Sequence, residues 1–239
     1  MTPDSSNRPV ALITGASAGL GLALAHGLAD RGWTLVIDAR GAGPLKDAAD
    51  ALANRTDVVP LAGDVVDPEH RLDLVDVVNQ LGRLDLLVNN ASYLGPSPLQ
   101  AIAAADLDEL RRVYEVDVLA PIALTQALLP PLTTASGVLI NVSSDAAVEA
   151  YETWGGYGSA KAALDHATRV LAAEHPALAV YAVDPGDLRT AMHQAAFPGE
   201  DISDRPEPAT VVPAFLKLLD SRPASGRYRA AEFAPAVTS

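Results

Sequence analysis

The sequence predicts an α/β fold in which helices cover both faces of a doubly wound parallel β-sheet, giving three α/β/α layers. Short apolar runs alternate with helical patterns along nearly the whole chain of 239 residues. Such alternation is typical of parallel strands joined by helical crossovers. The runs are continuously apolar, as expected of strands buried on both faces. The apolar share of 49% supports one substantial core, so we expect a single domain over residues 1–239.

In the first half of the chain, strands and helices are recognised by apolar runs and by the signals at their ends. A strand at residues 10–13 leads through a glycine-rich turn into a helix over residues 20–30, which Gly32 ends. Pro68 marks the start of a helix that runs to residue 81. Further strands are predicted at residues 33–37, 57–62 and 84–88.

The second half contains the longest helical pattern, residues 106–129. Pro121 is expected to bend this helix, and Pro130 and Pro131 are expected to stop it. Residues 188–208 are rich in proline, glycine and charge, which predicts a mobile flap. Strands are predicted at residues 137–142, 178–183 and 227–231, and helices at residues 157–174 and 208–219.

Charge and composition exclude several classes of partner. Lys and Arg number 17 against 30 Asp and Glu, and the net charge of −13 disfavours nucleic acid and anionic membranes. The absence of cysteine excludes disulfides and thiolate metal sites. The histidines show no ligand spacing, so no metal site is predicted, and each is expected at the surface or on a helix. Residues 1–8 are polar and no apolar run approaches the roughly 18 residues of a spanning helix, so we expect a cytoplasmic protein.

A glycine-rich turn, Thr14-Gly15-Ala16-Ser17-Ala18-Gly19-Leu20-Gly21, follows the first strand. Residues without Cβ let a backbone reverse tightly and approach a pyrophosphate. The N-terminus of the following helix favours an anion. By itself the turn fits a cofactor loop and an ordinary β-to-α turn equally well.

Tyr157 and Lys161 are four residues apart on a predicted helix and so share one face. A nearby ammonium group favours the phenolate form of a tyrosine, which otherwise is a poor acid or base at neutral pH. Ser144 follows a predicted strand, where its hydroxyl can bond a substrate oxygen. A tyrosine and a lysine at this spacing also occur as an ordinary surface pair.

Taken together and in order, these motifs resemble the short-chain dehydrogenase/reductase family over roughly residues 9–233. The glycine turn resembles the family's TGxxxGxG loop, and residues 157–161 resemble its YxxxK motif. The other matching segments are Asp64-Val65, Asn89-Asn90-Ala91-Ser92, Asn141-Val142-Ser143-Ser144, and Pro185-Gly186 with Thr190.

The resemblance implies a Rossmann fold and hydride transfer between a nicotinamide cofactor and a carbonyl or alcohol carbon. Tyr157 would protonate the substrate oxygen in reduction, Lys161 would hold the nicotinamide ribose and lower the tyrosine pKa, and Ser144 would position the oxygen. Asp117 completes the predicted catalytic set. The predicted cofactor-binding residues are Gly15, Ser17, Gly19, Leu20, Gly21, Arg40, Asp64, Val65, Asn90, Ala91, Tyr157, Lys161, Pro185, Gly186, Leu188 and Thr190. Within this set, Asp64 and Val65 are expected at the adenine and Asn90 at the adjacent ribose.

The end of the second strand decides the cofactor. Ala39 stands where family members that use NAD carry an acid, and Arg40 follows it. A small residue followed by arginine favours NADP(H), because a guanidinium pairs with a 2′-phosphate. Two features leave NAD(H) possible: Ala18 provides no basic side chain in the glycine loop, and Asp38 places an acid one residue early.

Asp117 stands where the family usually has an asparagine whose backbone carbonyl binds a water linked to the lysine. A carboxylate there is expected to raise the pKa of Lys161 and to offset part of its effect on Tyr157. We favour an active reductase or dehydrogenase. The alternatives are a cofactor-binding sensor or scaffold that does not turn over, and an epimerase or dehydratase that uses hydride transfer transiently.

The segments that border the substrate in this family are largely apolar or aromatic here, which favours a small or medium apolar carbonyl compound or alcohol. The expected wall residues are Tyr93, Ala146, Tyr151, Trp154, Leu188, Met192 and Phe197, some of which core packing explains equally well. A homodimer or homotetramer is expected through the helices at residues 106–129 and 157–174. Leu119, Leu124, Leu164 and Val170 permit that contact, although a buried helix would show the same pattern.

Overall fold

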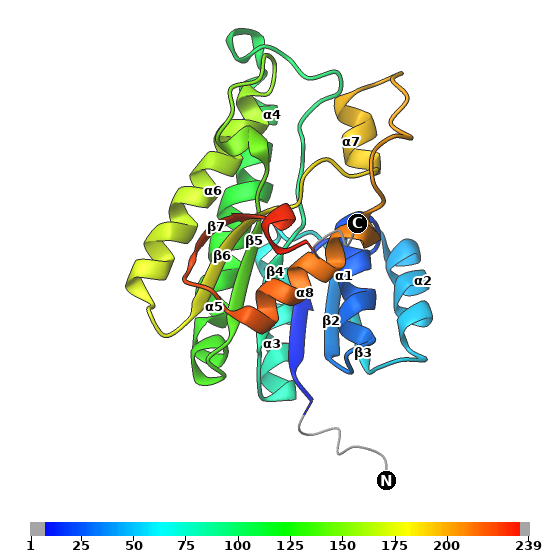
Figure 1. Cartoon of the computed structure of the whole chain (residues 1–239), viewed down its shortest axis with the longest axis vertical. Helices are drawn as coiled ribbons and strands as arrows, with labels where there is room; N and C mark the ends of the chain where they lie inside the picture. The colour runs from blue at the N-terminus through cyan, green and yellow to red at the C-terminus, as the bar shows by residue number, and fades with distance from the viewer. Residues whose placement is uncertain (1–7, 235–239) are drawn as a thin grey trace, which may run out of the picture.

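The computed structural model describes residues 8–234, and the expectation about the polar residues 1–7 lies outside this range. The chain forms a parallel sheet of seven strands in the order β3-β2-β1-β4-β5-β6-β7 (Figure 1). The strands are β1 (Val10–Ile13), β2 (Thr34–Ala39), β3 (Val58–Ala62), β4 (Leu86–Asn89), β5 (Val138–Val142), β6 (Ala179–Asp184) and β7 (Gly226–Arg229). The predicted doubly wound α/β fold is confirmed.

The strand order reverses beside β1, and this reversal determines where a ligand can bind. Strands β2 and β3 extend the sheet from one edge of β1, whereas β4 and the later strands extend it from the other. Ile13, at the end of β1, therefore lies between Ile37 of β2 and Val88 of β4. The connections leaving β1 and β4 turn to opposite sides, and a crevice opens at the carboxyl ends of the strands.

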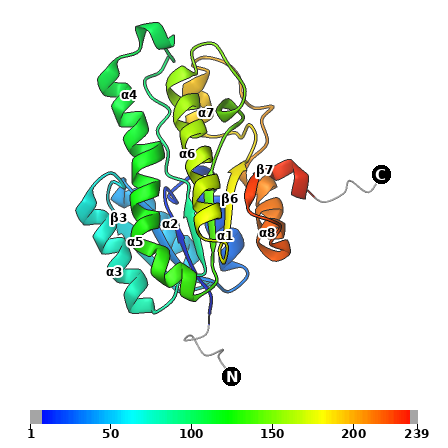
Figure 2. The ribbon, with the colours of Figure 1, turned by 90° about the vertical axis from the view of Figure 1, so that its left-hand side faces the viewer.

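Helices cover both faces of the sheet (Figure 2). Leucines of α1 and α2 and Phe215 of α8 pack on one face with Ile13 and Ile37. Leucines of α3 and α5 pack on the other face with Leu12 and Leu87. The helices are α1 (Gly19–Ala29), α2 (Ala42–Leu52), α3 (Pro68–Leu81), α4 (Leu107–Tyr114), α5 (Ala120–Thr134), α6 (Gly155–Glu174), α7 (Ala191–Ala196) and α8 (Val212–Ser221).

Helix α2 was not predicted. Its first turn contains Gly43 and Pro44, which are typical of loops, and it has no side-chain cap at its start. Its buried residues, Leu45, Ala48, Ala49 and Leu52, repeat at helical spacing. That periodicity is the sequence signal from which α2 could have been predicted.

The expected helix at residues 106–129 is divided differently. Helix α4 passes through a π-helical turn, Glu115–Leu119, into α5, and Pro121 is the second residue of α5, directly after this turn. Pro130 and Pro131 do not stop the helix, because the burial of Leu128 and Leu132 against the sheet continues on both sides of them. Residues 107–134 are apolar and long enough to cross a membrane, contrary to expectation, but half of the relevant window is buried, as in a core helix.

The predicted loop at residues 188–208 contains helix α7, which Thr190 caps by accepting a hydrogen bond from the N–H of His193. A 3₁₀ turn at Pro208–Val211 then leads into α8. The remaining predicted elements differ from the structure only by a few residues at their ends. Helix α3 and strand β1 match their predicted bounds.

Candidate active site

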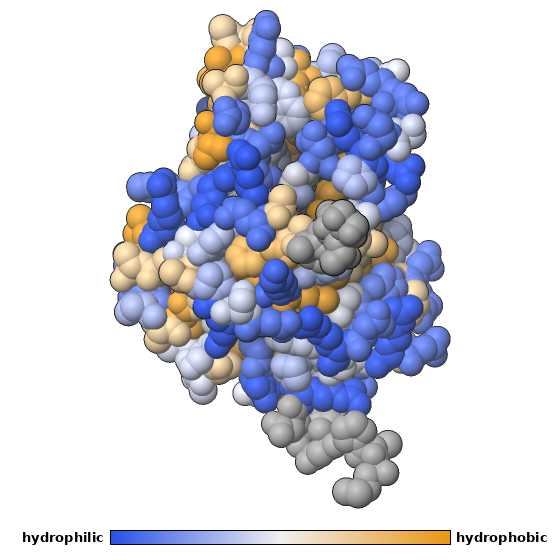
Figure 3. Space-filling model, in the orientation of Figure 1, coloured by the Kyte–Doolittle hydropathy of each residue, from blue (hydrophilic) through white to orange (hydrophobic). Residues whose placement is uncertain are grey.

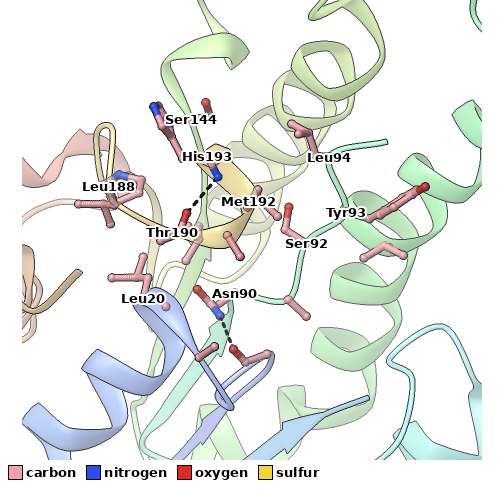
Figure 4. A pocket seen from close by; sticks show the side chains of 18 of the residues that line it. Leu20, Asn90, Ser92, Tyr93, Leu94, Ser144, Leu188, Thr190, Met192 and His193 are labelled. Atoms are coloured by element: carbon pink, nitrogen blue, oxygen red, sulfur yellow. Dashed lines mark hydrogen bonds between the residues drawn. The ribbon is translucent and has the colours of Figure 1, made fainter. Parts of the chain in front are cut away.

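A cleft opens at the carboxyl end of the sheet, where the strand order reverses, and it continues under α7 (Figure 4). Leu20 and Asn90 lie on one side of this cleft, and Thr190 and Met192 lie opposite them. Of the predicted cofactor-binding residues, all except Gly21 line the cleft. Three predicted catalytic residues, Ser144, Tyr157 and Lys161, line it as well, whereas Asp117 does not.

The glycine loop is shaped for a close approach between segments. Gly15 and Gly19 have φ of +66° and +56°, a conformation that side-chain-bearing residues rarely adopt. A Cβ on Gly21 would lie 2.5 Å from the Gly15 oxygen, so Gly21 brings α1 against the loop instead of contacting the cleft. No side chain caps the start of α1, whose N–H groups are therefore available to an anion.

Asp38, in strand β2, holds the glycine loop through a hydrogen bond. Its side chain is 1% exposed, accepts a hydrogen bond of 2.8 Å from the N–H of Gly15, and lies 3.0 Å from Nε2 of His70. Both carboxylate oxygens of Asp38 therefore have partners within the protein. The acid at this position no longer argues for NAD as the cofactor. His70 lies on helix α3, one of the two locations expected for the histidines, and it is buried there.

The pKa values of this pair reflect its burial. Burial raises the pKa of Asp38, and the hydrogen bond with His70 offsets part of that effect. The hydrogen bond with Asp38 raises the pKa of His70. The contact between β2 and α3 therefore raises the pKa of His70, whereas burial raises that of Asp38.

Asn90 has a different role from the one expected. Its amide donates to the backbone oxygens of Thr14, at 2.8 Å, and Gly15, at 3.1 Å. The hydroxyl of Thr14 in turn accepts from the backbone N–H groups of Asn90 and Ala91. The Asn90 side chain therefore joins the end of β4 to the glycine loop.

The predicted adenosine end of the cleft lies beyond β2. Arg40 is exposed at the cleft, while Ala39 is 7% exposed and packs in the core. Asp64 and Val65 line the cleft nearby, and Asp64 accepts from the N–H of Val66. Arg40 is thus free to meet a charged group that enters from solvent.

Tyr157 and Lys161 lie in consecutive turns of α6 and are 8% and 2% exposed. The Nζ of Lys161 lies 5.4 Å from the centre of the Tyr157 ring and donates to the backbone oxygen of Val142 at 3.0 Å. The indole of Trp154 packs against the phenol in an edge-to-face arrangement, with the ring centres 6.0 Å apart. Packing therefore fixes the phenol beside a single ammonium group.

Asp117 lies behind Lys161 in the π-helical turn, with its side chain fully buried. Its Oδ1 is 3.0 Å from Nζ of Lys161 and also accepts a hydrogen bond from the hydroxyl of Ser92. Its Oδ2 accepts from the N–H of Tyr93 at 3.2 Å. The carboxylate thus contacts the lysine directly.

These contacts raise the pKa values of both groups. Burial raises the pKa of the Tyr157 phenol, the charge of Lys161 lowers it in part, and the charge of Asp117 raises it. Burial lowers the pKa of Lys161, but the electrostatic interactions with Tyr157 and with the carboxylate of Asp117 outweigh it and give a net rise. The direction expected for Lys161 from Asp117 is confirmed. At neutral pH the pair is a phenol and an ammonium ion.

Ser144 lies just after β5, and its hydroxyl is hydrogen-bonded to Asp145 at 3.1 Å. The backbone oxygen of Ser144 accepts from Arg227 of β7 at 2.9 Å. Arg227 also pairs with the buried carboxylates of Asp165, at 2.9 Å, and Asp184, at 3.4 Å. Sequence reasoning missed this arginine, because residues 83 positions apart meet only in the folded sheet.

The expected substrate wall is partly realised. Tyr93, Trp154, Leu188 and Met192 line the cleft, whereas Ala146, Tyr151 and Phe197 do not. The rings of Tyr151 and Phe197 instead pack against Trp154. Leu94 and His193, which were not predicted, complete the lining under α7.

Comparison with known proteins agrees with this geometry. A family model described as short chain dehydrogenase matches residues 9–201. The uncharacterized oxidoreductase YciK of Escherichia coli is 32% identical over 233 residues, which are 93% of this chain and 91% of that protein. Sepiapterin reductase of Rattus norvegicus is 32% identical over 201 residues, or 78% of this chain and 77% of that protein. A short chain dehydrogenase structure from Shigella flexneri, complexed with NADP, is 30% identical with a TM-score of 0.86, covering 94% of this chain and 98% of that one.

Proposed function

Because the chain belongs to the short-chain dehydrogenase/reductase family, we propose that it is an NADP(H)-dependent oxidoreductase acting on a small or medium, largely apolar carbonyl compound or alcohol. The observation that carries the proposal is the meeting of Ser144, Tyr157 and Lys161 in one cleft with the glycine loop. The cofactor supplies or accepts the hydride, and the chain supplies the proton and holds the reacting groups.

The raised pKa of Tyr157 suits it to carbonyl reduction. Burial keeps the phenol protonated at neutral pH, so it carries the proton that the substrate oxygen needs. Lys161 places a positive charge 5.4 Å from the ring and stabilises the phenolate that forms. The Ser144 hydroxyl exchanges its contact with Asp145 for one with the substrate oxygen, where negative charge develops.

Arg40 supports NADP(H) as the cofactor. Its guanidinium is exposed at the end of β2, where a 2′-phosphate would lie, and Asp38 is withdrawn into the pair with His70. The Shigella flexneri relative is complexed with NADP, which agrees with this preference. NAD(H) remains the alternative to be measured beside it.

The proposal is tested by following NADPH and NADH oxidation with aldehydes, ketones, quinones and sepiapterin. We expect turnover with NADPH that Tyr157→Phe lowers by about a hundredfold or more, with NADPH binding retained. Binding of NADPH without turnover of any compound would favour the second candidate, a cofactor sensor or scaffold. The buried Asp117–Lys161 pair is the observation that favours that candidate, because the carboxylate offsets part of the effect of the lysine charge on Tyr157. Racemisation or water loss without net cofactor oxidation would instead identify an epimerase or dehydratase.

We further propose that residues 1–239 act as one domain in which residues 188–208 form a flap over the cleft. The location of α7 supports this, since Thr190, Met192 and His193 line the cleft. Ligand-induced closure is expected to protect the segment from limited proteolysis. Equal cleavage rates with and without NADPH would argue against closure.

We propose that the protein forms a homodimer or homotetramer through α5 and α6. Leu119, at the end of the π-helical turn before α5, is 57% exposed, and Val170 of α6 is 43% exposed, whereas Leu124 and Leu164 are buried. Apolar residues also gather along the α4 and α6 side in Figure 3. Val170→Glu is expected to lower the mass measured by light scattering, and an unchanged mass would place the interface elsewhere.

A cytoplasmic location, with a small-molecule substrate and neither nucleic acid nor membrane as partner, completes the proposal. The net charge of −13 supports the exclusion of these two partners, because it repels both nucleic acid and anionic membranes. Cell fractionation and a nucleic-acid binding assay at low salt test it. Retention on anionic vesicles or on DNA would contradict it.

A further inference from the structure

We propose that His193, on helix α7, determines substrate specificity, because its Nε2 accepts a hydrogen bond from a hydroxyl or N–H group that the substrate carries in addition to its reacting carbonyl. The proposal rests on the proposed reductase function and narrows its substrate class. His193 lines the cleft together with Thr190 and Met192 of the same segment (Figure 4). It therefore lies where a bound substrate can contact it.

The imidazole of His193 is buried, and one of its nitrogens is unpaired. The side chain is only 10% exposed, and Nε2 has no hydrogen-bond partner among residues 8–234. A buried polar atom without a partner costs free energy, which a ligand that supplies the partner recovers. Leu94 and Met192, which also line the cleft, pack in one apolar cluster and have no proton to donate. The partner of Nε2 is therefore a group of the ligand.

Asp187 decides which kind of group Nε2 binds. Its Oδ1 lies 4.0 Å from Nδ1 of His193, and its Oδ2 lies 3.9 Å from Nε of Arg205. The negative charge beside Nδ1 favours the tautomer that carries its proton there, and a neutral imidazole then presents a lone pair at Nε2. Asp145 and Asp187 both line the cleft, and their charges disfavour an anionic group at the same site. The geometry thus selects a neutral hydrogen-bond donor, such as a hydroxyl.

Packing fixes the position of the imidazole. The backbone N–H of His193 donates to the hydroxyl of Thr190 at 3.1 Å, and the imidazole centre lies 4.9 Å from the centre of the Phe197 ring. The Phe197 ring packs on Trp154 at 5.9 Å, and Trp154 packs on the Tyr157 phenol at 6.0 Å. A series of packed rings therefore joins His193 to the proposed proton donor. A group held in this way discriminates between ligands, because the direction of its hydrogen bond is set.

Matched aryl ketones test whether Nε2 recognises a hydroxyl. The probes are acetophenone and its derivatives with a hydroxyl on the α-carbon or at the meta or para position of the ring, which differ in the distance from hydroxyl to carbonyl. The quantity measured is the ratio of kcat/KM with NADPH for each hydroxyl derivative to that for acetophenone. The intrinsic reactivity of each ketone is the same with every variant, so a change in this ratio reports the contact with the protein.

His193→Phe keeps a ring against Phe197 but has no ring nitrogen. It should lower the ratio about three- to tenfold for at least one hydroxyl derivative, the usual effect of one hydrogen bond. His193→Gln, whose amide group can take the place of Nε2, should recover most of the ratio. The derivative with the largest change identifies where the substrate carries its hydroxyl.

Gln194→Ala is the matched control on the same helix. Gln194 follows His193, is not among the residues that line the cleft, and donates to the backbone oxygens of Phe197, at 2.9 Å, and Glu200, at 3.1 Å. Its loss disturbs the packing of α7 without removing Nε2. All four ketones should then be affected alike, and the ratio should stay within about twofold of the wild-type value.

A second measurement needs no turnover. Nitrogen NMR of the labelled imidazoles, with His193→Phe to identify the signals of His193, reports the tautomer and the hydrogen bonding of Nε2. The protein is held at one fixed pH and saturated with NADP⁺. At least one hydroxyl derivative should shift the Nε2 resonance, whereas acetophenone should not. NADP⁺ alone should leave this resonance unchanged.

The results separate this inference from the proposed function. Equal ratios for wild type and His193→Phe with all three hydroxyl derivatives, or an Nε2 resonance that none of them shifts, would overturn the role of His193. A shift with NADP⁺ alone would assign Nε2 to the cofactor, and an equal change of the ratio in Gln194→Ala would assign the effect to the packing of α7; either result also overturns it. Absence of wild-type turnover with every carbonyl probe would overturn the reductase proposal, and the resonance titration would then decide the contact with His193 by itself.

Discussion

The carboxylate of Asp38 joins the glycine loop to helix α3, accepting from Gly15 at 2.8 Å and lying 3.0 Å from His70. One buried acid thereby fixes the backbone that would contact a pyrophosphate. A Cβ on Gly63 would lie only 2.2 Å from the His70 ring, so the imidazole fits tightly beside β3. The relationship explains why an acid at the end of β2 is compatible with a preference for NADP(H).

Replacing His70 with alanine should destabilise the protein by about 1–3 kcal/mol, because one oxygen of the buried Asp38 loses its partner. The effect depends on pH. The pKa of His70 is raised above its ordinary 6.5, so its contribution is fully present below pH 6.5 and is lost as pH rises through the folded pKa. The pKa of Asp38 is also raised, and titration of this carboxyl changes the stability near and above its ordinary pKa of 3.8, a more acidic range than that of His70.

Urea unfolding of wild type and His70→Ala, from about pH 5.5 to about pH 8.5, measures how the contribution of His70 to stability depends on pH. The gap in free energy of unfolding between wild type and His70→Ala should narrow as pH rises. His166→Ala is the control, because His166 is exposed on α6. A constant gap across the range would show that the contribution of His70 does not depend on its charge.

Replacing Arg40 with alanine should lower kcat/KM for NADPH by about tenfold to a hundredfold, the usual effect of losing a charge-assisted hydrogen bond to phosphate. The value for NADH should stay within about twofold, because NADH has no 2′-phosphate. Arg55→Ala is the matched control, since Arg55 pairs with Asp30 at an exposed site. A parallel fall with both cofactors would assign Arg40 a role outside phosphate recognition.

Replacing Asp117 with asparagine should shift the pH profile of the reaction toward acid. The charge of Asp117 raises the pKa values of both Tyr157 and Lys161, so its removal lowers them. Reduction requires the protonated phenol and declines as pH rises through its pKa, so this decline should begin at lower pH in the variant. Alcohol oxidation, which requires the phenolate, should begin at lower pH as well.

Profiles of kcat for both directions, measured with saturating cofactor, check this shift. Glu109→Gln serves as a control for the loss of an acid that bonds Tyr93 farther from the reacting groups. Identical profiles for wild type and Asp117→Asn would remove Asp117 from the proton chemistry.

Replacing Arg227 with methionine should destabilise the fold by about 2–4 kcal/mol, because it leaves the buried carboxylate of Asp165 without its counter-charge and that of Asp184 with only Arg229, at 3.9 Å. The same change releases the backbone oxygen of Ser144, so kcat should fall as well. Arg227→Lys should recover more of the stability than of kcat, since an ammonium group cannot reach all three oxygens at once. Thermal unfolding and steady-state rates measure the two effects, and unchanged kcat in the methionine variant would contradict the positioning role.

The sequence by itself determined the frame of the protein. Continuous apolar runs identified the parallel strands, because strands buried on both faces exclude polar residues. The glycine turn and the Tyr157–Lys161 spacing are local patterns, and local patterns are readable without the fold. In the folded chain the loop lines the same cleft as Ser144, Tyr157 and Lys161, whose catalytic roles stay a prediction.

Only the tertiary structure decided the partners of the buried polar groups. Asp38 meets His70, Ser92 meets Asp117, and Arg227 meets Ser144 across 32, 25 and 83 positions of sequence. Packing also overrode local signals at Pro130 and Pro131, where burial of neighbouring leucines keeps α5 helical. A side chain's type limits the bonds that it can make, but the choice among partners depends on which distant strands and helices the folded sheet brings into contact.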